Sequence, residues 1–335
     1  DILLVKDGAT IGKTAILNKK PFEKMAVNEH VFLIRPNKKI NSKLLYYLIG
    51  GDSGFTQIKL TETGSAQGGI NLEFPDIVLI TITEDLNKQE DIFSFLDSKT
   101  SQLSQTISSD KKLIELLKEK RTALINHVVT KGLNPKAKMK DSGIEWIGEV
   151  PEGWEVRKIK QVSDVRISNI DKKSEENEPD VLLCNYVDVY KNEFITSEIN
   201  FMKATASIEQ IKKFTIKKDD VIITKDSEEP TDIAVPALVM EDFKGVVCGY
   251  HLALIRPNKK YLQGGYLFRS FQSKKINDQF VVEANGVTRF GISTYPINNS
   301  LLVIPPKPEQ SQIVQYLDKS TSKIDQTIQK IEEKI

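Results

Sequence analysis

Residues 87–131 read NKQEDIFSFLDSKTSQLSQTISSDKKLIELLKEKRTALINHVVTK and contain neither glycine nor proline. Apolar side chains recur along this stretch in alternating steps of about four and three residues, at Phe93, Leu96, Leu103, Ile107, Ile114, Leu117, Leu124 and Val128. A repeat of about 3.5 residues is typical of helices that pack along a shared seam. The stretch therefore predicts one helix over residues 87–131, about 65 Å long. An average globular helix has only ~12 residues.

A second, shorter stretch near the C-terminus carries the same spacing, at Val314, Leu317, Thr321, Ile324, Ile328, Ile331 and Ile335. One interpretation is that each helix belongs to the core of its own domain. The length of the first helix favours the other interpretation, in which the two helices pair antiparallel as a coiled-coil spacer.

The chain repeats itself around these helices. VNEHVFLIRPNKK (27–39) returns as VCGYHLALIRPNKK (247–260), and IFSFLDSKTSQLSQTI (92–107) returns as IVQYLDKSTSKIDQTI (313–328). The opening DILLVKD returns as DVIITKD (220–226). Because the unit is so long, this is one domain plan used twice and not a solenoid.

The phase of the repeat defines five segments. The second copy begins with a leading part, up to about Lys218, that has no partner in the first copy, so the first copy lacks roughly its first 80 residues. The composition of each copy predicts an α+β region of short strands and a few helices, followed by a long helix. The predicted segments are an incomplete mixed domain, a central helix, a Lys/Gly/Pro linker, a second mixed domain and a distal helix, at residues 1–86, 87–131, 132–141, 142–306 and 307–335.

Composition narrows the class of protein. The 335 residues carry a net charge of +1, so any nucleic-acid contact must be local and not a global basic bias. Cys184 and Cys248 lie in apolar runs, which favours buried thiols in a reducing cytoplasm over a disulfide framework. No apolar run approaches the ~18 residues of a membrane span, and no signal peptide is visible.

The opening stretch DILLVKDGATIGKTAIL resembles a phosphate-binding loop at first sight. Only three residues separate Gly8 from Gly12, however, where the loop needs four for its backbone N–H groups to wrap phosphates. Pro21 also stops any helix that should offer its N-terminus to the phosphate. We expect no NTPase site here.

Other catalytic sets are equally weak. The Pro-Pro of IPPKPEQ (304–310) lacks the preceding Asn or Asp and the following aromatic of an amino-methyltransferase, and it reads as a break between a strand and a helix. Glu84 and Asp85 suit a helix start better than a nuclease site. The three histidines, His30, His127 and His251, lack metal-ligand spacing. His30 and His251 share a repeat position, which favours structural packing and leaves DNA contact open.

Three segments carry a resemblance to a known family. MKDSGIEWIGEVPEGWEV (139–156), PPKPEQSQIVQYLDKSTSKID (305–325) and IELLKEKRTALINHVVTKGL (114–133) resemble the specificity (S) subunit of type I restriction–modification enzymes. The order of segments is also the family's: target-recognition domain, central helix, second target-recognition domain, distal helix. The missing front of the first domain is a departure from it.

The resemblance implies a DNA-reading subunit without catalysis, metal or cofactor of its own. It implies that each target-recognition domain reads one half of a split site in double-stranded DNA, and that the helices set the gap. It further implies two methyltransferase (M) subunits as partners and restriction (R) subunits bound through them, in host defence. Self-association of incomplete chains is also open.

A local basic segment is the first candidate for DNA contact. Residues 251–277 carry six lysines and arginines and no Asp or Glu. Arg269, Lys274 and Lys275 fall in a helix-like run beside aromatic residues, which predicts a phosphate-contacting face. A solvated helix face is the plain alternative.

Base readout is expected where the two copies diverge in polar loops, because the two halves would read different bases. KDGATIGKTA against KDSEEPTDIA is one such pair, and TETGSAQGGI against EANGVTRFGI is the other. The candidate readers in these loops are Lys6, Thr10, Lys13, Ser65, Gln67, Lys225, Ser227, Thr288 and Arg289. The rival hypothesis is a coiled-coil adaptor whose mixed domains bind protein instead of DNA.

Overall fold

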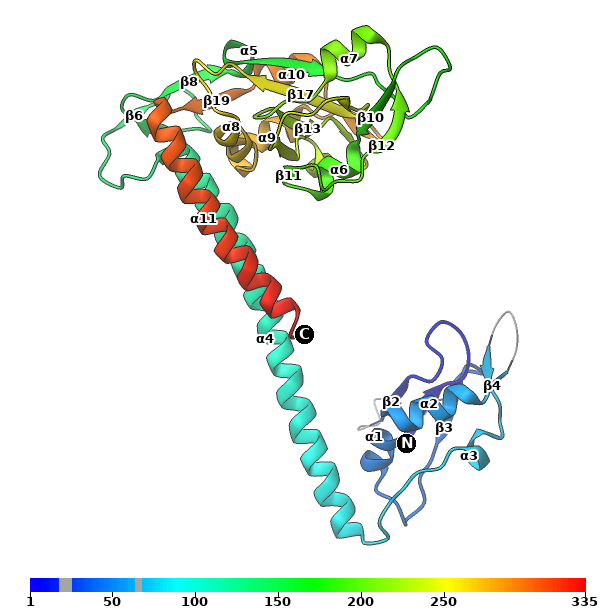
Figure 1. The fold of residues 1–335 in the computed structure, drawn as a ribbon. Helices are drawn as coiled ribbons and strands as arrows, with labels where there is room; N and C mark the ends of the chain where they lie inside the picture. Colours follow the sequence, from blue (N-terminus) through cyan, green and yellow to red (C-terminus); the bar gives the residue numbers. More distant parts are fainter. Residues whose placement is uncertain (18–25, 64–67) are drawn as a thin grey trace. The chain divides into compact units, whose positions relative to one another are not determined.

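The computed structural model describes residues 1–17, 26–63 and 68–335 (Figure 1). The chain divides into two compact units, Asp1–Lys111 and Lys112–Ile335. A helix of 46 residues, α4 (Leu86–Lys131), contributes to both units, and α11 (Lys307–Glu332) belongs to the second. The predicted α+β class with long helices is confirmed, and the predicted start of the first helix differs by one residue.

Local signals in the sequence define both ends of α4. At the start, the Asp85 carboxylate accepts a hydrogen bond from the N–H of Asn87 (2.9 Å), which satisfies a free donor of the first turn. At the end, Gly132 adopts a φ of +77°, and its N–H donates to the carbonyl of Val128 (3.0 Å). Glycine is the usual residue for this left-handed position. The glycine-free run therefore stops where the helix stops.

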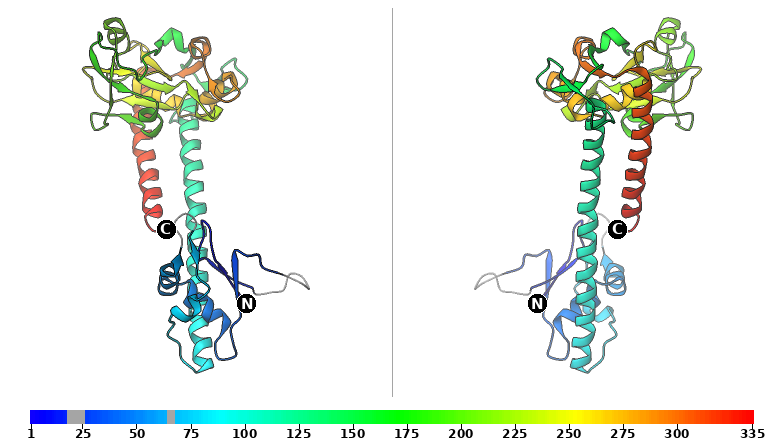
Figure 2. Two further views of the ribbon diagram at one scale, coloured as in Figure 1. Left: turned by 90° about the vertical axis from the view of Figure 1, so that its right-hand side faces the viewer. Right: turned by 90° about the vertical axis from the view of Figure 1, so that its left-hand side faces the viewer.

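Helices α4 and α11 pair antiparallel in the second unit, as predicted. Figures 1 and 2 both show α11 beside the C-terminal half of α4, running in the opposite direction. Ile114 of α4 is buried with three residues of α11, namely Ile324, Ile328 and Ile331. Further along, Arg121 interrupts the seam and bonds to Asp325 of α11 (3.0 Å). The described seam is thus apolar around Ile114 and is interrupted by the ion pair between Arg121 and Asp325.

The same spacing predicts that Leu103 and Ile107 belong to the seam, but both are exposed. The reason is geometric. Helix α11 ends at Glu332, and its last buried residue, Ile331, packs in the same cluster as Ile114. Helix α11 therefore does not extend as far as Leu103 and Ile107, and the 3.5-residue pattern of α4 continues beyond its observed partner.

The first unit is a small sheet with helices against it. Its elements are β1 (Ile2–Val5), β2 (Thr14–Ile16), β3 (Val31–Ile34), α1 (Ser42–Gly50), α2 (Asp52–Leu60), β4 (Glu62–Thr63), β5 (Gly69–Ile70) and α3 (Phe74–Ile77). Strand β1 lies in the middle and pairs antiparallel with both β2 and β3. Ile2, Leu4 and Ile58 are fully buried at the centre of its core.

The second unit is larger. Its strands are β6 (Met139–Asp141), β7 (Glu149–Pro151), β8 (Glu155–Lys158), β9 (Ser163–Ile167), β10 (Asp180–Cys184), β11 (Phe194–Ile195), β12 (Met202–Thr205), β13 (Val221–Thr224), β14 (Asp226–Ser227), β15 (Pro236–Val239), β16 (Val246–Cys248), β17 (Leu252–Pro257), β18 (Phe290–Gly291) and β19 (Leu301–Ile304). Besides the long helices it holds α5 (Ile159–Val162), α6 (Tyr186–Lys191), α7 (Ile208–Phe214), α8 (Gly264–Phe271), α9 (Lys274–Glu283) and α10 (Thr294–Asn299).

Helix α8 ties the central sheet of the second unit to the long helices. The sheet has the order β11-β15-β13-β17-β9, and β13 and β17 are buried along nearly their whole length. Tyr266 of α8 is fully buried, and its hydroxyl donates to the carbonyls of Val129 (3.0 Å) and Val303 (2.8 Å). Burial raises the pKa of this hydroxyl far above its ordinary value, so it stays a neutral donor.

The repeat in sequence is a repeat in structure. The segments of β1, β2 and β3 correspond to β13, β15 and β17, and both sets have the same strand order. The first unit differs at both edges. Strand β15 pairs with β11 as well as with β13, whereas β2 has only β1 as a partner among the described residues. Strand β17 is covered by β9, which belongs to the leading part of the second copy, whereas β3 has no partner on that side among the described residues.

This difference predicts unequal amide protection. The carbonyl of His30 accepts a hydrogen bond from the N–H of Lys6, the residue that follows β1. Hydrogen-bonded and non-hydrogen-bonded pairs alternate along antiparallel strands, so the N–H of Leu33 points away from β1. The N–H of its counterpart, Leu254, points toward β9, where Leu254 pairs with Arg166. We expect the Leu254 amide to exchange with deuterium at least about tenfold more slowly than that of Leu33. Equal protection of the two amides in exchange measurements would contradict the open edge.

Two further expectations concern cysteines and membranes. Cys184 and Cys248 are both buried and unpaired, and they are directly opposite each other in the parallel pair β10–β16. Burial raises the pKa of both thiols, as expected for inert core cysteines. In the described part of the chain, no helix is long and apolar enough to cross a bilayer.

Candidate nucleic-acid interface

In the second unit, two polar loops meet where strand β13 ends. The chain continues from β13 through Lys225 into β14, which pairs with β18. The N–H of Lys225 donates to the carbonyl of His251 (2.8 Å), and the carbonyl of Lys225 accepts from Ile292 (2.9 Å). Strands β14 and β18 are antiparallel, and Ser227 pairs with Phe290. The loop after β14, residues 228–235, and the loop before β18, residues 284–289, therefore lie at the same end of one short ribbon.

The first unit builds the same junction. Lys6 donates to the carbonyl of His30 (2.8 Å) and accepts from Ile70 (2.8 Å), and Asp7 forms a bridge with Gly69. The loop that begins at Gly8 therefore occupies the place of residues 228–235. In the second unit the two places where the repeat diverges in sequence are therefore adjacent. In the first unit, residues 64–67 of the second such place lie outside the described residues. The adjacency in the second unit is what a composite recognition surface requires.

A carboxylate–histidine pair braces each junction. Nδ1 of His251 lies 2.8 Å from Oδ2 of Asp226, and Nδ1 of His30 lies 2.6 Å from Oδ1 of Asp7. The expected structural role of both histidines thus takes the form of a polar contact and not of apolar packing. Burial alone would raise the pKa of Asp226, but hydrogen bonds from Lys225 and His251 outweigh it and lower that pKa.

The lowered pKa has a consequence for stability. A carboxylate whose pKa is depressed by folding stabilises the folded state above the ordinary aspartate pKa of about 3.9. We therefore expect the contribution of Asp226 to be present at neutral pH and to be lost as the pH falls below about 4. Acid unfolding of wild type and Asp226→Asn would show it, because the variant should lack this part of the pH dependence.

The stretch DGATIGKT forms a hairpin and not a phosphate loop. Gly8 and Gly12 both adopt positive φ, +88° and +84°. The N–H of Gly12 returns to the carbonyl of Val5 (2.9 Å), and β2 follows at Thr14 as a strand antiparallel to β1. Lys13 is followed directly by strand β2 and not by a helix, so this loop has no adjoining helix N-terminus to bind a phosphate.

The predicted readers of the first unit divide into three groups. Thr10 and Lys13 are exposed on the hairpin. Lys6 is partly buried, and its Nζ lies 5.9 Å from the ring centre of Phe32. Ser65 and Gln67 lie outside the residues that the structure describes. Among the described residues, Thr10 and Lys13 are thus the predicted readers of this unit whose side chains are exposed.

In the second unit, Thr288 and Arg289 are exposed at the loop before β18. Lys225 and Ser227 are not. Lys225 is 11% exposed and bonds to Asp226, with its Nζ 5.1 Å from the ring centre of Tyr250. Ser227 is buried, and its Oγ lies 3.1 Å from the Tyr186 hydroxyl. These two residues shape the base of the loops, whereas Thr288 and Arg289 extend from them.

Arg269 does not belong to the exposed basic face that the sequence predicts. Its side chain is 2% exposed, and the guanidinium donates to Asp318 of α11 (2.7 Å) and to Gln272 (2.7 Å). Its role is to hold α8 against the long helix. Lys274 and Lys275 are exposed, but they begin α9, whose opposite end leads into the loop before β18. The three residues therefore do not form one face.

Sequence comparison missed three tyrosines near these loops. Tyr186 and Tyr190 stack on α6 with ring centres 5.5 Å apart, and the Tyr190 hydroxyl donates to Asp232 (3.1 Å) in the loop after β14. Tyr250 is exposed beside His251. Tyr186 and Tyr190 lie in the leading part of the second copy, which has no partner in the first, so a comparison of copies could not find them.

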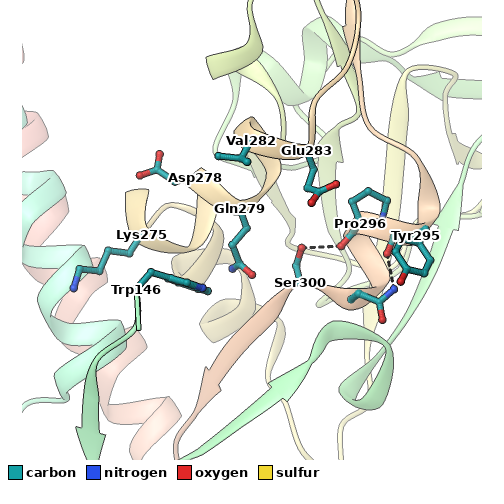
Figure 3. Close-up of a pocket in the computed structure, with 10 residues that line it drawn as sticks. Trp146, Lys275, Asp278, Gln279, Val282, Glu283, Tyr295, Pro296 and Ser300 are labelled. Atoms are coloured by element: carbon teal, nitrogen blue, oxygen red, sulfur yellow. Dashed lines mark hydrogen bonds between the residues drawn. The ribbon is translucent and has the colours of Figure 1, made fainter. Parts of the chain in front are cut away.

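An open groove lies on another part of the second unit (Figure 3). It has a volume of about 580 Å³, and its lining includes Trp146, Lys275, Val282 and Tyr295. The hydrogen bonds among its residues are internal to α10 and its C-terminal cap, for example from Ser300 Oγ to the carbonyl of Pro296 (2.8 Å). Among the residues described, no cluster of metal-binding side chains occurs in the groove or elsewhere.

Comparison with known proteins agrees with this architecture. Residues 151–335, more than half of the chain, match the type I restriction modification DNA specificity domain. The chain therefore belongs to this family of specificity subunits. The resemblance read from the three sequence segments is confirmed.

Two curated relatives come from Methanocaldococcus jannaschii. The type I restriction enzyme MjaVIII specificity subunit is 25% identical over 223 residues, which are 67% of this chain and 49% of the relative. The putative type I restriction enzyme MjaX specificity subunit is 24% identical over 174 residues, 51% of this chain and 40% of the relative. The chain thus matches less than half the length of either relative.

Two solved structures share the fold. One, described as the structural basis of complex assembly and conformational transition of the type I R-M system, aligns with a TM-score of 0.75 at 14% identity, over 99% of this chain and 77% of that chain. The HsdS subunit from Thermoanaerobacter tengcongensis aligns with a TM-score of 0.54 at 15% identity, over 91% and 67%. At such identities the likeness concerns the fold.

Proposed function

We propose that this chain is the DNA sequence-recognition subunit of a type I restriction–modification complex and that it reads a bipartite site. The observation that carries the proposal is the duplicated junction. Both units hold a Lys-Asp pair and a histidine in the same geometry, while the loops that extend from the junction differ. A constant frame with variable polar loops suits two half-sites of different sequence.

The remaining parts of the proposal follow the family. The chain is non-catalytic and cytoplasmic, and it serves as a scaffold for two M subunits and, through them, for R subunits. The net charge of +1 is consistent with a reader that relies on its partners for many phosphate contacts. Methylation sequencing of DNA from cells that carry the chain and its M partner tests the proposal. A two-part methylated motif is expected. DNA from these cells without any such motif would overturn the proposal.

Readout by the exposed loop of the second unit gives a sharper test. Arg289→Ala is expected to weaken binding of the M-containing complex to its site by about 5- to 150-fold, corresponding to 1–3 kcal/mol for a lost base contact. The effect should fall on one half-site and relax its base preference. Lys323→Ala, an exposed change on α11, serves as the control. Unchanged affinity and preference in Arg289→Ala would remove this residue from the interface.

Lys13→Ala is the corresponding change in the first unit. A base contact would be lost only at the other half-site, whereas a phosphate contact would weaken binding uniformly and reduce its salt dependence. A gel-shift series with random duplexes, with and without M subunits, separates the proposal from a coiled-coil adaptor that binds only protein. The adaptor would shift no duplex under either condition.

A further inference from the structure

A buried glutamine joins α11 to the second unit. Gln310 lies in the first turn of α11 and is fully buried. Its Oε1 accepts from the backbone N–H of Gln263 (2.9 Å), immediately before α8. Its Nε2 donates to the carbonyls of Tyr261 (2.9 Å) and Pro305 (2.9 Å). One side chain therefore links the helix, the segment that enters it and the loop that precedes α8.

Gln89 makes the same set of contacts in the first unit. It lies in the first turn of α4 and is also fully buried. Its Oε1 accepts from the N–H of Asn41 (2.7 Å), and its Nε2 donates to the carbonyls of Lys39 (3.1 Å) and Thr83 (2.7 Å). The glutamine and its three partners recur 221 or 222 residues later in the second unit.

The chemistry of this clamp is specific to an amide. Both N–H groups of the side chain and its oxygen are satisfied by backbone groups without water. Glutamate has the same shape but would place a second oxygen against two carbonyls. Leucine would leave one backbone N–H and two carbonyls without this partner. An apolar residue would fill the same buried volume. The glutamine at both positions therefore indicates that directional hydrogen bonds, and not burial alone, are required there.

A second contact lies eight residues further along each helix. Asp97 of α4 accepts from the Tyr47 hydroxyl (3.2 Å), and Asp318 of α11 accepts from Arg269 (2.7 Å). Eight residues correspond to about 12 Å along the helix axis. Two attachments at this separation fix the direction in which a helix leaves its unit, whereas one attachment would act as a pivot.

We propose that Gln89 and Gln310 are positioning residues that set the angle between each recognition unit and its long helix, and thereby the gap between the two half-sites. The inference rests on the proposed function. At 46 residues α4 is about 69 Å long, so a tilt of about 5° displaces its far end by about 6 Å. That is nearly two base-pair steps of about 3.4 Å.

The test compares the gap in the methylated motif among variants of the full chain expressed with its M partner. Gln310→Glu and Gln89→Glu are expected to keep both half-site sequences but to accept gaps one base pair shorter or longer. In binding measurements on duplexes that differ only in gap, discrimination against the wrong gap should fall at least about tenfold. Gln315→Glu, an exposed change on α11, is the matched control and should keep the wild-type gap.

The outcomes separate the two proposals. A wild-type complex that methylates no two-part motif overturns the proposed function, and the inference with it. A normal wild-type motif, together with glutamate variants that methylate less DNA at the unchanged gap, overturns the inference alone, because the clamp would then be only structural. Should Gln310→Glu fail to accumulate as folded protein, Tyr47→Phe removes only one hydroxyl at the second attachment, and the same comparison of gaps decides.

Discussion

Arg256→Ala is expected to lower the free energy of unfolding of the second unit by about 3–5 kcal/mol. Arg256 forms two hydrogen bonds to Asp220, from Nε (2.7 Å) and from Nη2 (2.6 Å). The Asp220 side chain is 2% exposed, so alanine at position 256 would leave a buried carboxylate without its counter-charge. The hydrogen bond to Asp220 also raises the pKa of Arg256, as expected for a stabilised ion pair.

The chain provides its own control for this experiment. Arg35 and Asp1 occupy the equivalent positions in the first unit and form the same two bonds at 3.0 Å, but Arg35 is 71% exposed. An exposed pair contributes at most about 1 kcal/mol, so Arg35→Ala should have a small effect. Exchange of the most protected amides of β13 and β1 measures each unit separately. Equal losses in the two variants would show that burial of Asp220 does not decide the effect.

Trp154→Ala is expected to destabilise the second unit by about 3–5 kcal/mol, the usual cost of removing a fully buried large aromatic side chain. Trp154 is 1% exposed, and its Nε1 donates to Glu309 in the first turn of α11 (2.9 Å). A Cβ at Gly132 would lie 3.1 Å from its ring. The side chain therefore packs where α4 ends and α11 begins.

Trp146 is the matched control, because it is 39% exposed at the edge of the groove in Figure 3. Trp146→Ala should cost less than about 1 kcal/mol. Thermal unfolding followed by far-ultraviolet circular dichroism measures both variants without depending on tryptophan fluorescence. A Trp154→Ala protein that unfolds within a degree or two of wild type would show that packing of this side chain between the end of α4 and the start of α11 does not stabilise the second unit.

The scaffold could be predicted from sequence because it depends on local and periodic signals. Ile114 of α4 and Ile328 of α11 each belong to an apolar repeat of about 3.5 residues in their own helix. Asp85 and Gly132 are strong signals for the two ends of α4. The repeat then predicts the second copy from the first. Such signals do not require knowledge of which strands are neighbours.

The contacts of single polar residues could not be predicted in the same way. Arg269 looks like a surface cation in sequence, and only the packing of α8 on α11 reveals Asp318 as its partner, 49 residues later. His251 aligns with His30 in the repeat, but its bond to Asp226 depends on the pairing of β13 with β17. Gln89 and Gln310 look like solvated helix residues, because nothing local indicates their burial.

The antiparallel pair of long helices has a consequence for synthesis of the protein. Ile114, Leu117 and Leu124 of α4 leave the ribosome well before α11, because roughly 176 residues separate Lys131 from Lys307. At about 5–20 residues per second, the nascent chain carries this apolar stripe uncovered for about 10–35 s. We expect holding chaperones to bind this stripe during translation, until α11 is made and covers it.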